Sequence, residues 1–267
     1  MHLAVLGCGK MGSALIRGIL QSPAPPDSIH IFDIDSSATA ALQLDFPSLS
    51  VSPDPLSCAA AAQTVLLCVK PHDLVPLVTS LANSGRSRLF ISIAAGIPLT
   101  RIESAAGSSG RVIRVMPNTP ALVGRGVSAV VPGSRATEED VALAESILSA
   151  VGTVVRLPEK LLDAVTGVSG SGPAYIFLII EALSDAGVSQ GLPRPTALTL
   201  AAETVLGAAE MVLRTGLHPA QLKDQVTSPG GTTIAALEVL ERRGVRGAFF
   251  EAVAAAARRS EEMGREN

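Results

Sequence analysis

Short apolar runs alternate with amphipathic stretches along the first part of the chain. Runs such as LAVLG and TVLLCV are bounded by glycine or polar residues, which is typical of buried strands. We expect strands over residues 3–7, 29–32, 64–69, 88–93, 111–116, 126–131 and 153–157. Helical spacing predicts helices over 11–21, 36–45, 73–82, 98–106 and 137–150. This order predicts an α/β fold, with a doubly wound and largely parallel sheet in residues 1–158.

The second part of the chain, residues 159–267, has helical patterns throughout and predicts an all-α domain. Over 194–214, apolar residues recur at helical spacing from Leu198 through Val205 to Val212. Residues 173–187 differ, because YIFLII is apolar on every side and a helix of that kind must be covered all round. The small size of this domain favours a dimer core for that helix. The alternative is the central helix of a monomeric bundle.

Composition excludes several classes of function. Apolar residues make up 47% of the chain and charged residues 17%, as in globular proteins. A net charge of −3 offers no basic field for nucleic acid, and the absence of Trp with a single Tyr argues against base stacking. The apolar run 174–180 is interrupted by Glu181 and Asp185 and is too short to span a bilayer.

The cysteines and the N-terminus bear on location. Three cysteines without a CxxC pair indicate reduced thiols and no metal site. The chain enters a strand-like run at Leu3 without the pattern of a signal peptide. We therefore expect a cytoplasmic protein.

A glycine motif follows the first predicted strand. LGCGKMG places Gly7, Gly9 and Gly12 at the start of a helix, the spacing of a Rossmann-type dinucleotide site. Gly7 permits a tight turn, Gly9 lets the backbone approach a pyrophosphate, and Gly12 lets helix and strand pack closely. The helix amides would then hold the anion. The alternative is that the glycines serve only strand–helix packing.

Asp33 ends the second predicted strand and bears on the choice of cofactor. A carboxylate there accepts hydrogen bonds from a ribose 2′-OH and repels a 2′-phosphate. No Lys or Arg lies between Arg17 and Lys70 to offset that repulsion. The sequence therefore predicts NADH in preference to NADPH. The alternative is that Asp33 or Asp35 merely caps the helix that starts near Ser36.

Two further strand-end loops, CVKP and SIAAG, lie where open α/β sheets bind ligands. Lys70 is interpreted either as a phosphate or substrate contact or as a solvated lysine. His72 is expected to start a helix rather than to act as a base. Packing of small residues explains Cys8 and Cys68 better than nucleophilic chemistry.

Near the end of the chain, SPGGTT precedes an amphipathic helix. Taken alone, this stretch indicates a turn whose Ser228 or Thr232 caps the helix. The same bare backbone and helix N-terminus suit a small carboxylate. Tyr175 is interpreted as structural, and Glu181 as a candidate buried acid on the same helix, without an assigned partner.

Six motifs in order, GCGKMG, CVKPHDL, SIAAGIPL, RVMPNTPALVGRG, VTGVSGSGPAY and LKDQVTSPGGTT, resemble pyrroline-5-carboxylate reductase over nearly the whole chain. The resemblance implies reduction of 1-pyrroline-5-carboxylate to proline by NAD(P)H, the last step of proline synthesis. It implies a Rossmann domain followed by a helical domain that interlocks with a partner subunit. Family members commonly assemble dimers into larger rings, often decamers.

The resemblance also assigns site residues. The cofactor would contact Leu6, Gly7, Cys8, Gly9, Lys10, Met11 and Gly12, then Cys68, Val69, Lys70 and Pro71, and finally Ala94, Ala95 and Gly96. The substrate would lie on Ser228, Gly230, Gly231, Thr232 and Thr233, with the catalytic Thr233 bonded to the ring nitrogen. Two departures concern the cofactor: FDID replaces a small polar or basic cluster, and Pro55 replaces an Asn of relatives.

Reduction of a cyclic imine needs little acid–base machinery, because a protonated imine already accepts hydride. The absence of an obvious catalytic dyad is consistent with that reaction. A 3-hydroxyacid dehydrogenase-like enzyme is one alternative, although GVSGSGPAYIF lacks the catalytic Lys that its pattern requires. A non-catalytic dinucleotide-sensing or pyridoxal-phosphate-handling protein is the other, and the intact SPGGTT argues against it.

Overall fold

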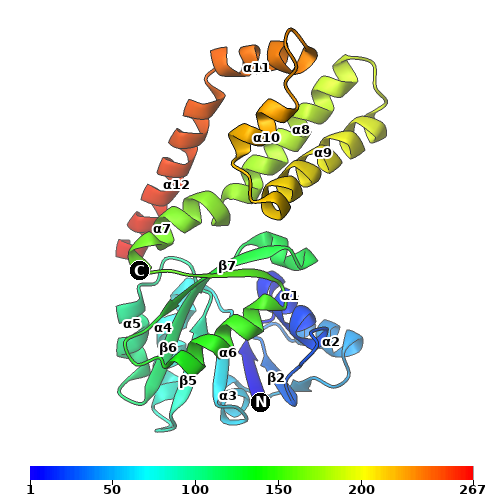
Figure 1. Cartoon of the computed structure of the whole chain (residues 1–267). Coiled ribbons are helices and arrows are strands. Elements are labelled where there is room, and N and C mark those ends of the chain that lie inside the picture. Colours follow the sequence, from blue (N-terminus) through cyan, green and yellow to red (C-terminus); the bar gives the residue numbers. More distant parts are fainter. Residues whose placement is uncertain (267) are drawn as a thin grey trace. The chain divides into compact units, whose positions relative to one another are not determined.

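The computed structural model describes residues 1–266 and divides the chain into two compact units. Unit 1 comprises Met1–Ser171 together with the chain from Ala255 onward, and unit 2 comprises Gly172–Ala254. Figure 1 shows a sheet with flanking helices in unit 1 and helices in unit 2. Each unit is described by itself.

Unit 1 is built on one sheet, which within residues 1–266 has eight strands in the order β3-β2-β1-β4-β5-β6-β7-β8. All neighbouring strands are parallel except β6 and β7, which are antiparallel. The strands are β1 His2–Leu6, β2 Ser28–Phe32, β3 Ser50–Val51, β4 Thr64–Leu67, β5 Arg88–Ser92, β6 Gly110–Met116, β7 Gly126–Pro132 and β8 Gly152–Arg156. The predicted doubly wound, largely parallel sheet is confirmed.

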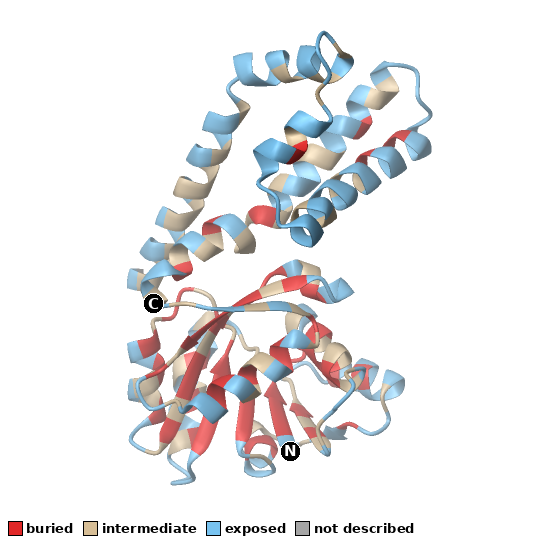
Figure 2. Cartoon of the chain, viewed as in Figure 1, coloured by how far each residue is buried: buried red, intermediate tan, exposed pale blue. Residues whose placement is uncertain are grey.

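Helices cover the sheet because each presents an apolar stripe to it. In α1, for example, Leu15, Ile16 and Ile19 are buried. Two apolar clusters, one containing Leu15 and the other Leu74, hold the layers together, and Figure 2 shows the strands as the most buried part of the unit. The helices are α1 Lys10–Leu20, α2 Ser36–Asp45, α3 Pro55–Ala60, α4 Pro71–Ala82, α5 Leu99–Ala106, α6 Glu138–Ser149 and α7 Leu162–Val165.

Short helical turns join these elements. A 3₁₀ turn, Thr119–Val123, lies between β6 and β7, and another, Glu159–Leu161, leads from β8 into α7. A π-helix, Thr166–Gly170, follows α7 and leads into the helical unit. Helices with this wide hydrogen-bond pattern often mark functional segments.

Unit 2 is entirely helical, as expected after residue 158. Its helices are α8 Gly172–Ser189, α9 Arg194–Thr215, α10 Pro219–Gln225, α11 Thr232–Arg242 and the first part of α12 Val245–Glu266. Few of its residues are buried: within the described chain these are Gly172, Ser184, Ala197, Ala201 and Leu222. Figure 2 accordingly shows these helices as largely exposed or half-buried.

The compact units do not part at the predicted boundary of 158 and 159. They part after Ser171 and again at Ala255, because the last turns of α12 belong to unit 1. There the Ser260 hydroxyl donates a hydrogen bond of 2.7 Å to the Asp163 carboxylate. Contacts within one chain do not define its domains, so the predicted division into domains 1–158 and 159–267 stays a prediction.

Candidate dinucleotide and substrate sites

The predicted site residues fall on two sets of turns. In unit 1 the predicted cofactor residues lie at the ends of four strands. Leu6 ends β1 and is followed by Gly7, Cys8 and Gly9, and α1 then opens with Lys10, Met11 and Gly12. Asp33 follows β2; the residues after β4 are Cys68, Val69, Lys70 and Pro71, and those after β5 are Ala94, Ala95 and Gly96. In unit 2, Ser228, Gly230 and Gly231 precede α11, and Thr232 and Thr233 begin it. The structure thus brings the dinucleotide residues to the carboxyl ends of neighbouring strands.

The three motif glycines have distinct steric roles. Gly7 has a φ of +98°, and a Cβ there would lie 2.6 Å from the backbone carbonyl carbon of Cys68. A Cβ on Gly12 would lie 2.1 Å from the carbonyl oxygen of Gly7. At Gly9, by contrast, a Cβ would meet no heavy atom of the described chain within 4 Å. Gly7 and Gly12 are therefore fixed by packing, while the backbone at Gly9 is open to a ligand.

The turn between β1 and α1 also has amides to offer. Gly9 is the N-cap of α1, and no side chain in residues 1–266 caps that helix. The turn follows β1, which has β2 on one side and β4 on the other, so the strand order reverses at this point of the sheet. Open α/β sheets bind ligands at such a switch point, and uncapped helix amides suit a phosphate group.

Asp33 links the end of β2 to this turn. Its carboxylate accepts a hydrogen bond of 2.5 Å from the Cys8 amide and one of 2.9 Å from the Asp35 amide. Asp35, not Asp33, is the N-cap of α2 and accepts from the Ser37 amide. The cap interpretation thus holds for Asp35, and the half-buried Asp33 carboxylate lies at the glycine turn.

The cysteines beside the turn are neutral thiols. Burial is the main cause that raises the pKa of Cys8 to about 12, and the nearby Asp33 carboxylate adds to it. Burial likewise raises the pKa of Cys68 well above its ordinary value. Because the thiolate is the nucleophilic form, this environment favours the packing interpretation of both residues.

The two other strand-end loops differ in exposure. Lys70 is exposed and is the N-cap residue of α4, while His72 lies inside that helix. After β5, the amide of Ala94 donates to the Ser92 hydroxyl at 3.3 Å, and Gly96 has a φ of +73°. The positive φ explains why a glycine ends this loop.

The SPGGTT stretch forms a closed turn before α11. The amide of Gly231 donates to the carbonyl of Ser228 at 3.1 Å. Pro229 and Gly230 lie inside this turn, and Gly230 has a φ of +67°. Gly231 is the N-cap, and no described side chain caps the helix, so neither Ser228 nor Thr232 acts as the expected cap. The first amides of α11 are therefore available to an anion.

A cavity of about 510 Å³ borders this turn and is lined by Gly230, Gly231 and Lys223 together with residues of α11. Thr233 is half-buried, whereas Thr232 is exposed. The cavity lining includes Glu238 and Glu241 but not Thr233, so the features that suit a small carboxylate are the bare backbone of the turn and the open helix start rather than the cavity.

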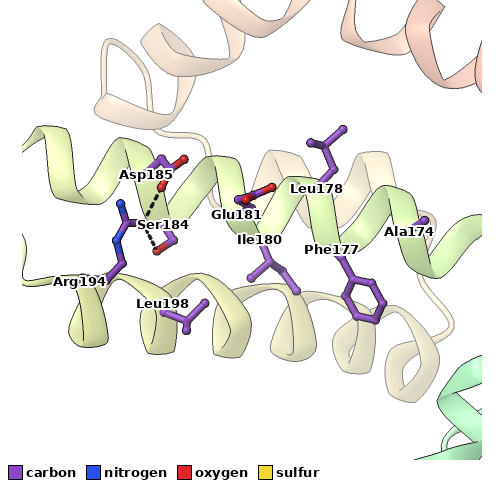
Figure 3. A pocket seen from close by; sticks show the side chains of 9 residues that line it. All are labelled: Ala174, Phe177, Leu178, Ile180, Glu181, Ser184, Asp185, Arg194 and Leu198. Atoms are coloured by element: carbon purple, nitrogen blue, oxygen red, sulfur yellow. Dashed lines mark hydrogen bonds and ion pairs between the residues drawn. The ribbon is translucent and has the colours of Figure 1, made fainter.

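The apolar helix α8 contributes to a second cavity, of about 740 Å³, between α8 and α9 (Figure 3). Arg194 of α9 donates to the Ser184 hydroxyl at 3.0 Å and to the Asp185 carboxylate at 2.5 Å. Glu181 and Phe177 line the same cavity and are exposed, so the expectation of a buried acid at Glu181 is wrong; Tyr175 is half-buried. No described contact gives Tyr175 or Glu181 a catalytic role.

Large apolar side chains lie exposed on both α8 and α9. The exposed fractions are 64% for Phe177, 66% for Leu178 and 84% for Leu213. Two helical segments, Glu159–Ser189 and Arg194–Thr215, are long and apolar enough to cross a membrane. Length and composition alone are weak evidence that they do so. Either a partner protein or lipid must cover such a surface.

Sequence patterns missed Asn118, Arg114 and Glu159. The Asn118 side chain accepts from the Val127 amide at 2.8 Å and donates to the Ser169 hydroxyl at 3.1 Å, so it joins β7 to the π-helix. The Glu159 carboxylate accepts from Arg114 and from the amide that opens α5. These contacts join residues far apart in the chain, and periodicity gives no signal for them.

Comparison with known proteins finds family matches for both the N-terminal and the C-terminal parts of the chain. Residues 159–263 match the family described as pyrroline-5-carboxylate reductase dimerisation, and residues 2–96 match NADP oxidoreductase, coenzyme F420-dependent. The chain is 47% identical to the pyrroline-5-carboxylate reductase of Methanosarcina acetivorans over 265 residues, 98% of each chain.

Solved structures give the same result. The pyrroline-5-carboxylate reductase of Coxiella burnetii has a TM-score of 0.92 at 36% identity, covering 98% of this chain and 97% of that one. The Plasmodium falciparum pyrroline carboxylate reductase, solved with NADP bound, has a TM-score of 0.87 at 31% identity, covering 99% and 98%.

Proposed function

Because the chain belongs to the pyrroline-5-carboxylate reductase family and therefore reduces 1-pyrroline-5-carboxylate to L-proline with a nicotinamide dinucleotide, we propose that NADH is its preferred cofactor. The observation that carries this proposal is the position of Asp33. Its carboxylate already bonds the Cys8 amide of the glycine turn, which places a negative charge beside the predicted ribose position.

Electrostatic repulsion by the Asp33 carboxylate favours NADH, which lacks the negatively charged 2′-phosphate of NADPH. Two unit charges of like sign 4 Å apart near a protein surface repel by about 4 kcal/mol, less in salt. The nearest basic residue earlier in the sequence, Arg17, pairs with Asp45 at 2.5 Å and lies over the Phe46 ring. A 2′-phosphate at Asp33 would thus meet a carboxylate, whereas a 2′-OH would donate a hydrogen bond to it.

The experiment compares kcat/KM for NADH and NADPH at saturating 1-pyrroline-5-carboxylate. We expect the wild type to favour NADH by about tenfold or more, and Asp33→Asn, which keeps an acceptor for Cys8, to shift the ratio toward NADPH. Asp27→Asn, at an exposed position directly before β2 and so at the opposite end of that strand from Asp33, is the control and leaves the ratio unchanged. A larger kcat/KM of the wild type with NADPH would overturn the proposal.

We assign the other cofactor contacts by the same geometry. The amides at the start of α1 hold the pyrophosphate, and Gly9 gives it access to the backbone. The loops Cys68–Pro71 and Ala94–Gly96, at the ends of the adjacent strands β4 and β5, complete the dinucleotide site.

The substrate binds on the SPGGTT turn in this proposal. The free amides at the start of α11 hold the carboxylate, each bond contributing about 1.5–3 kcal/mol. Thr233 hydrogen-bonds the ring nitrogen through its hydroxyl and can pass a proton there. When bound, the dinucleotide supplies the hydride, so the chain itself must chiefly orient the imine carbon and exclude competing geometries.

The helical unit has the dimerisation function that its family match names, and we propose that a second copy of the chain, rather than lipid, covers α8 and α9. Assembly of such dimers into a decamer is a further proposal. The three free cysteines support a reducing, cytoplasmic location. The oligomeric state is tested by sedimentation, as described in the Discussion.

A further inference from the structure

The loop after β5 is followed by a helix whose own sequence cannot cap it. The N-cap of α5 is Pro98, and the local residues supply no side-chain cap in the described chain. Prolines have no side-chain acceptor, so the first amides of the helix need a partner from elsewhere. This matters because α5 begins directly beyond the proposed cofactor loop Ala94–Gly96.

Glu159 supplies that missing partner from a distant part of the chain. Its Oε1 accepts a hydrogen bond of 2.6 Å from the amide of Leu99, the first residue of α5. A carboxylate at this position both satisfies an open amide and suits the positive end of the helix dipole. Glu159 therefore fixes the place at which the loop enters the helix.

Arg114 holds Glu159 in that position. Its Nη1 donates to the same Oε1 at 2.6 Å, and the Arg114 side chain is only 12% exposed. Arg114 lies on β6 directly beside Ser92, the last residue of β5. The Ser92 hydroxyl in turn accepts from the amide of Ala94 in the loop. The start of the loop is thus held by Ser92 and the start of α5 by the ion pair, from paired positions of β5 and β6.

The last turns of α12 come near the end of the loop but leave space there. A Cβ added at Gly264 would lie 3.6 Å from the carbonyl oxygen of Gly96, an ordinary van der Waals distance. The start of the loop is therefore held by Ser92, and the start of α5 beyond the loop is held by Glu159. Only the second of these contacts involves a charged pair, and it is the stronger of the two by type.

We propose that Glu159, held by Arg114, is a positioning residue that sets the conformation of the Ala94–Gly96 loop for dinucleotide binding. This inference rests on the proposed role of that loop in the cofactor site. Glu159, the first residue of the segment that matches the dimerisation family, lies in unit 1, so this contact is made within that unit.

The test measures KM and Kd for the preferred dinucleotide in Glu159→Ala and Glu159→Gln. Glu159→Ala leaves the Leu99 amide and Arg114 without their acceptor, and we expect both constants to rise about tenfold, the size of a lost helix cap. Glu159→Gln keeps an acceptor for Leu99 but loses the charge, so we expect a rise of about threefold. In both variants kcat and KM for 1-pyrroline-5-carboxylate stay within about twofold.

Glu138→Ala is the matched control, because Glu138 forms an ion pair with Arg156 in the same unit at an exposed site. It should leave all constants unchanged. If Glu159→Ala does not fold, Glu159→Gln decides alone. A fall in Tm with an unchanged dinucleotide KM would mean that Glu159 only stabilises the fold, and would overturn the proposal.

Ala95→Leu separates this inference from the function on which it rests. If Ala95→Leu raises the dinucleotide KM and the Glu159 variants do not, the loop binds cofactor but Glu159 does not position it. If none of these variants changes the dinucleotide KM, the loop is no part of the cofactor site. The proposed cofactor role of the loop and the positioning role of Glu159 then both fail.

Discussion

Single hydroxyl and guanidinium groups carry clear physical consequences in this protein. Thr233 lies at the start of α11, half-buried, beside amides that no described side chain occupies. Arg88 lies at the opposite extreme, 2% exposed inside unit 1. The first is proposed to serve the reaction and the second the fold, and substitution separates the two roles.

Removal of the Thr233 hydroxyl should impair the reaction without affecting the fold. We expect Thr233→Val, which is nearly isosteric, to lower kcat/KM for 1-pyrroline-5-carboxylate by about 10- to 100-fold, the cost of losing a charge-assisted hydrogen bond. Thr233→Ser keeps the hydroxyl and should recover most of the activity. Steady-state assays and Tm measurements check this, and equal kcat/KM in wild type and Thr233→Val would exclude a role for the hydroxyl.

Loss of the Arg88 guanidinium should instead destabilise unit 1. Its Nε donates to the Ala59 carbonyl, and its Nη1 donates to the Leu81 carbonyl and the Ser84 hydroxyl. Arg88→Met leaves buried acceptors at the ends of α3 and α4 unpaired, and we expect a loss of about 3 kcal/mol. A calorimetric Tm about 6–12 °C lower would follow.

The control for this change is Arg86→Met. Arg86 is exposed and donates one hydrogen bond to the Ala60 carbonyl, so its loss should lower Tm only slightly. An Arg88→Met protein as stable as Arg86→Met would show that the buried guanidinium contributes nothing to stability.

At the scale of elements, two glycines of the turn between β1 and α1 separate a steric effect on folding from an effect on dinucleotide binding. Gly9→Ala adds a methyl group in open space, so we expect an unchanged Tm and a KM for the dinucleotide raised about tenfold or more. Gly12→Ala places a methyl group against the Gly7 carbonyl and should lower Tm markedly. Thermal melts and cofactor titrations of both variants check the contrast; a Gly9→Ala enzyme with wild-type affinity would contradict it.

The long elements of this fold could be predicted from sequence, while short ones and distant contacts could not. Buried strands such as β1 and β4 read as continuous apolar runs between polar turns. In contrast, β3 has only two residues and α3 only six, so both are too short to show a period, and both were missed. The antiparallel pairing of β6 and β7 also left no sign, because a strand buried inside a sheet has the same apolar pattern in either direction.

The candidate site was predictable where backbone needs dictate residue type. Gly7 and Gly12 are glycines because any Cβ would clash, and that requirement is visible in the spacing. The choice between Asp33 and Asp35 as the cap of α2 required coordinates, since both have the right side chain and they differ only by two positions. Glu159 was invisible for a different reason: it caps a helix 60 residues earlier in the chain.

At the scale of the whole molecule, the exposed apolar helices predict coupled association and folding. Phe177→Asp replaces a 64% exposed ring on α8 with a charge, and we expect a smaller species in sedimentation and a loss of activity. Leu44→Asp, at an 83% exposed position on α2, is the control and should assemble normally. A Phe177→Asp protein with wild-type sedimentation would place the partner surface elsewhere.

The two ends of α12 belong to different units, and this gives the chain an unusual topology. Its first turns lie with the helical unit and its last turns with unit 1, where Ser260 bonds Asp163. The helical unit is therefore inserted into unit 1 and tethered at both ends, rather than appended to it. A protease nick in the exposed connection around Leu217 should leave two fragments that copurify, because unit 1 retains part of each.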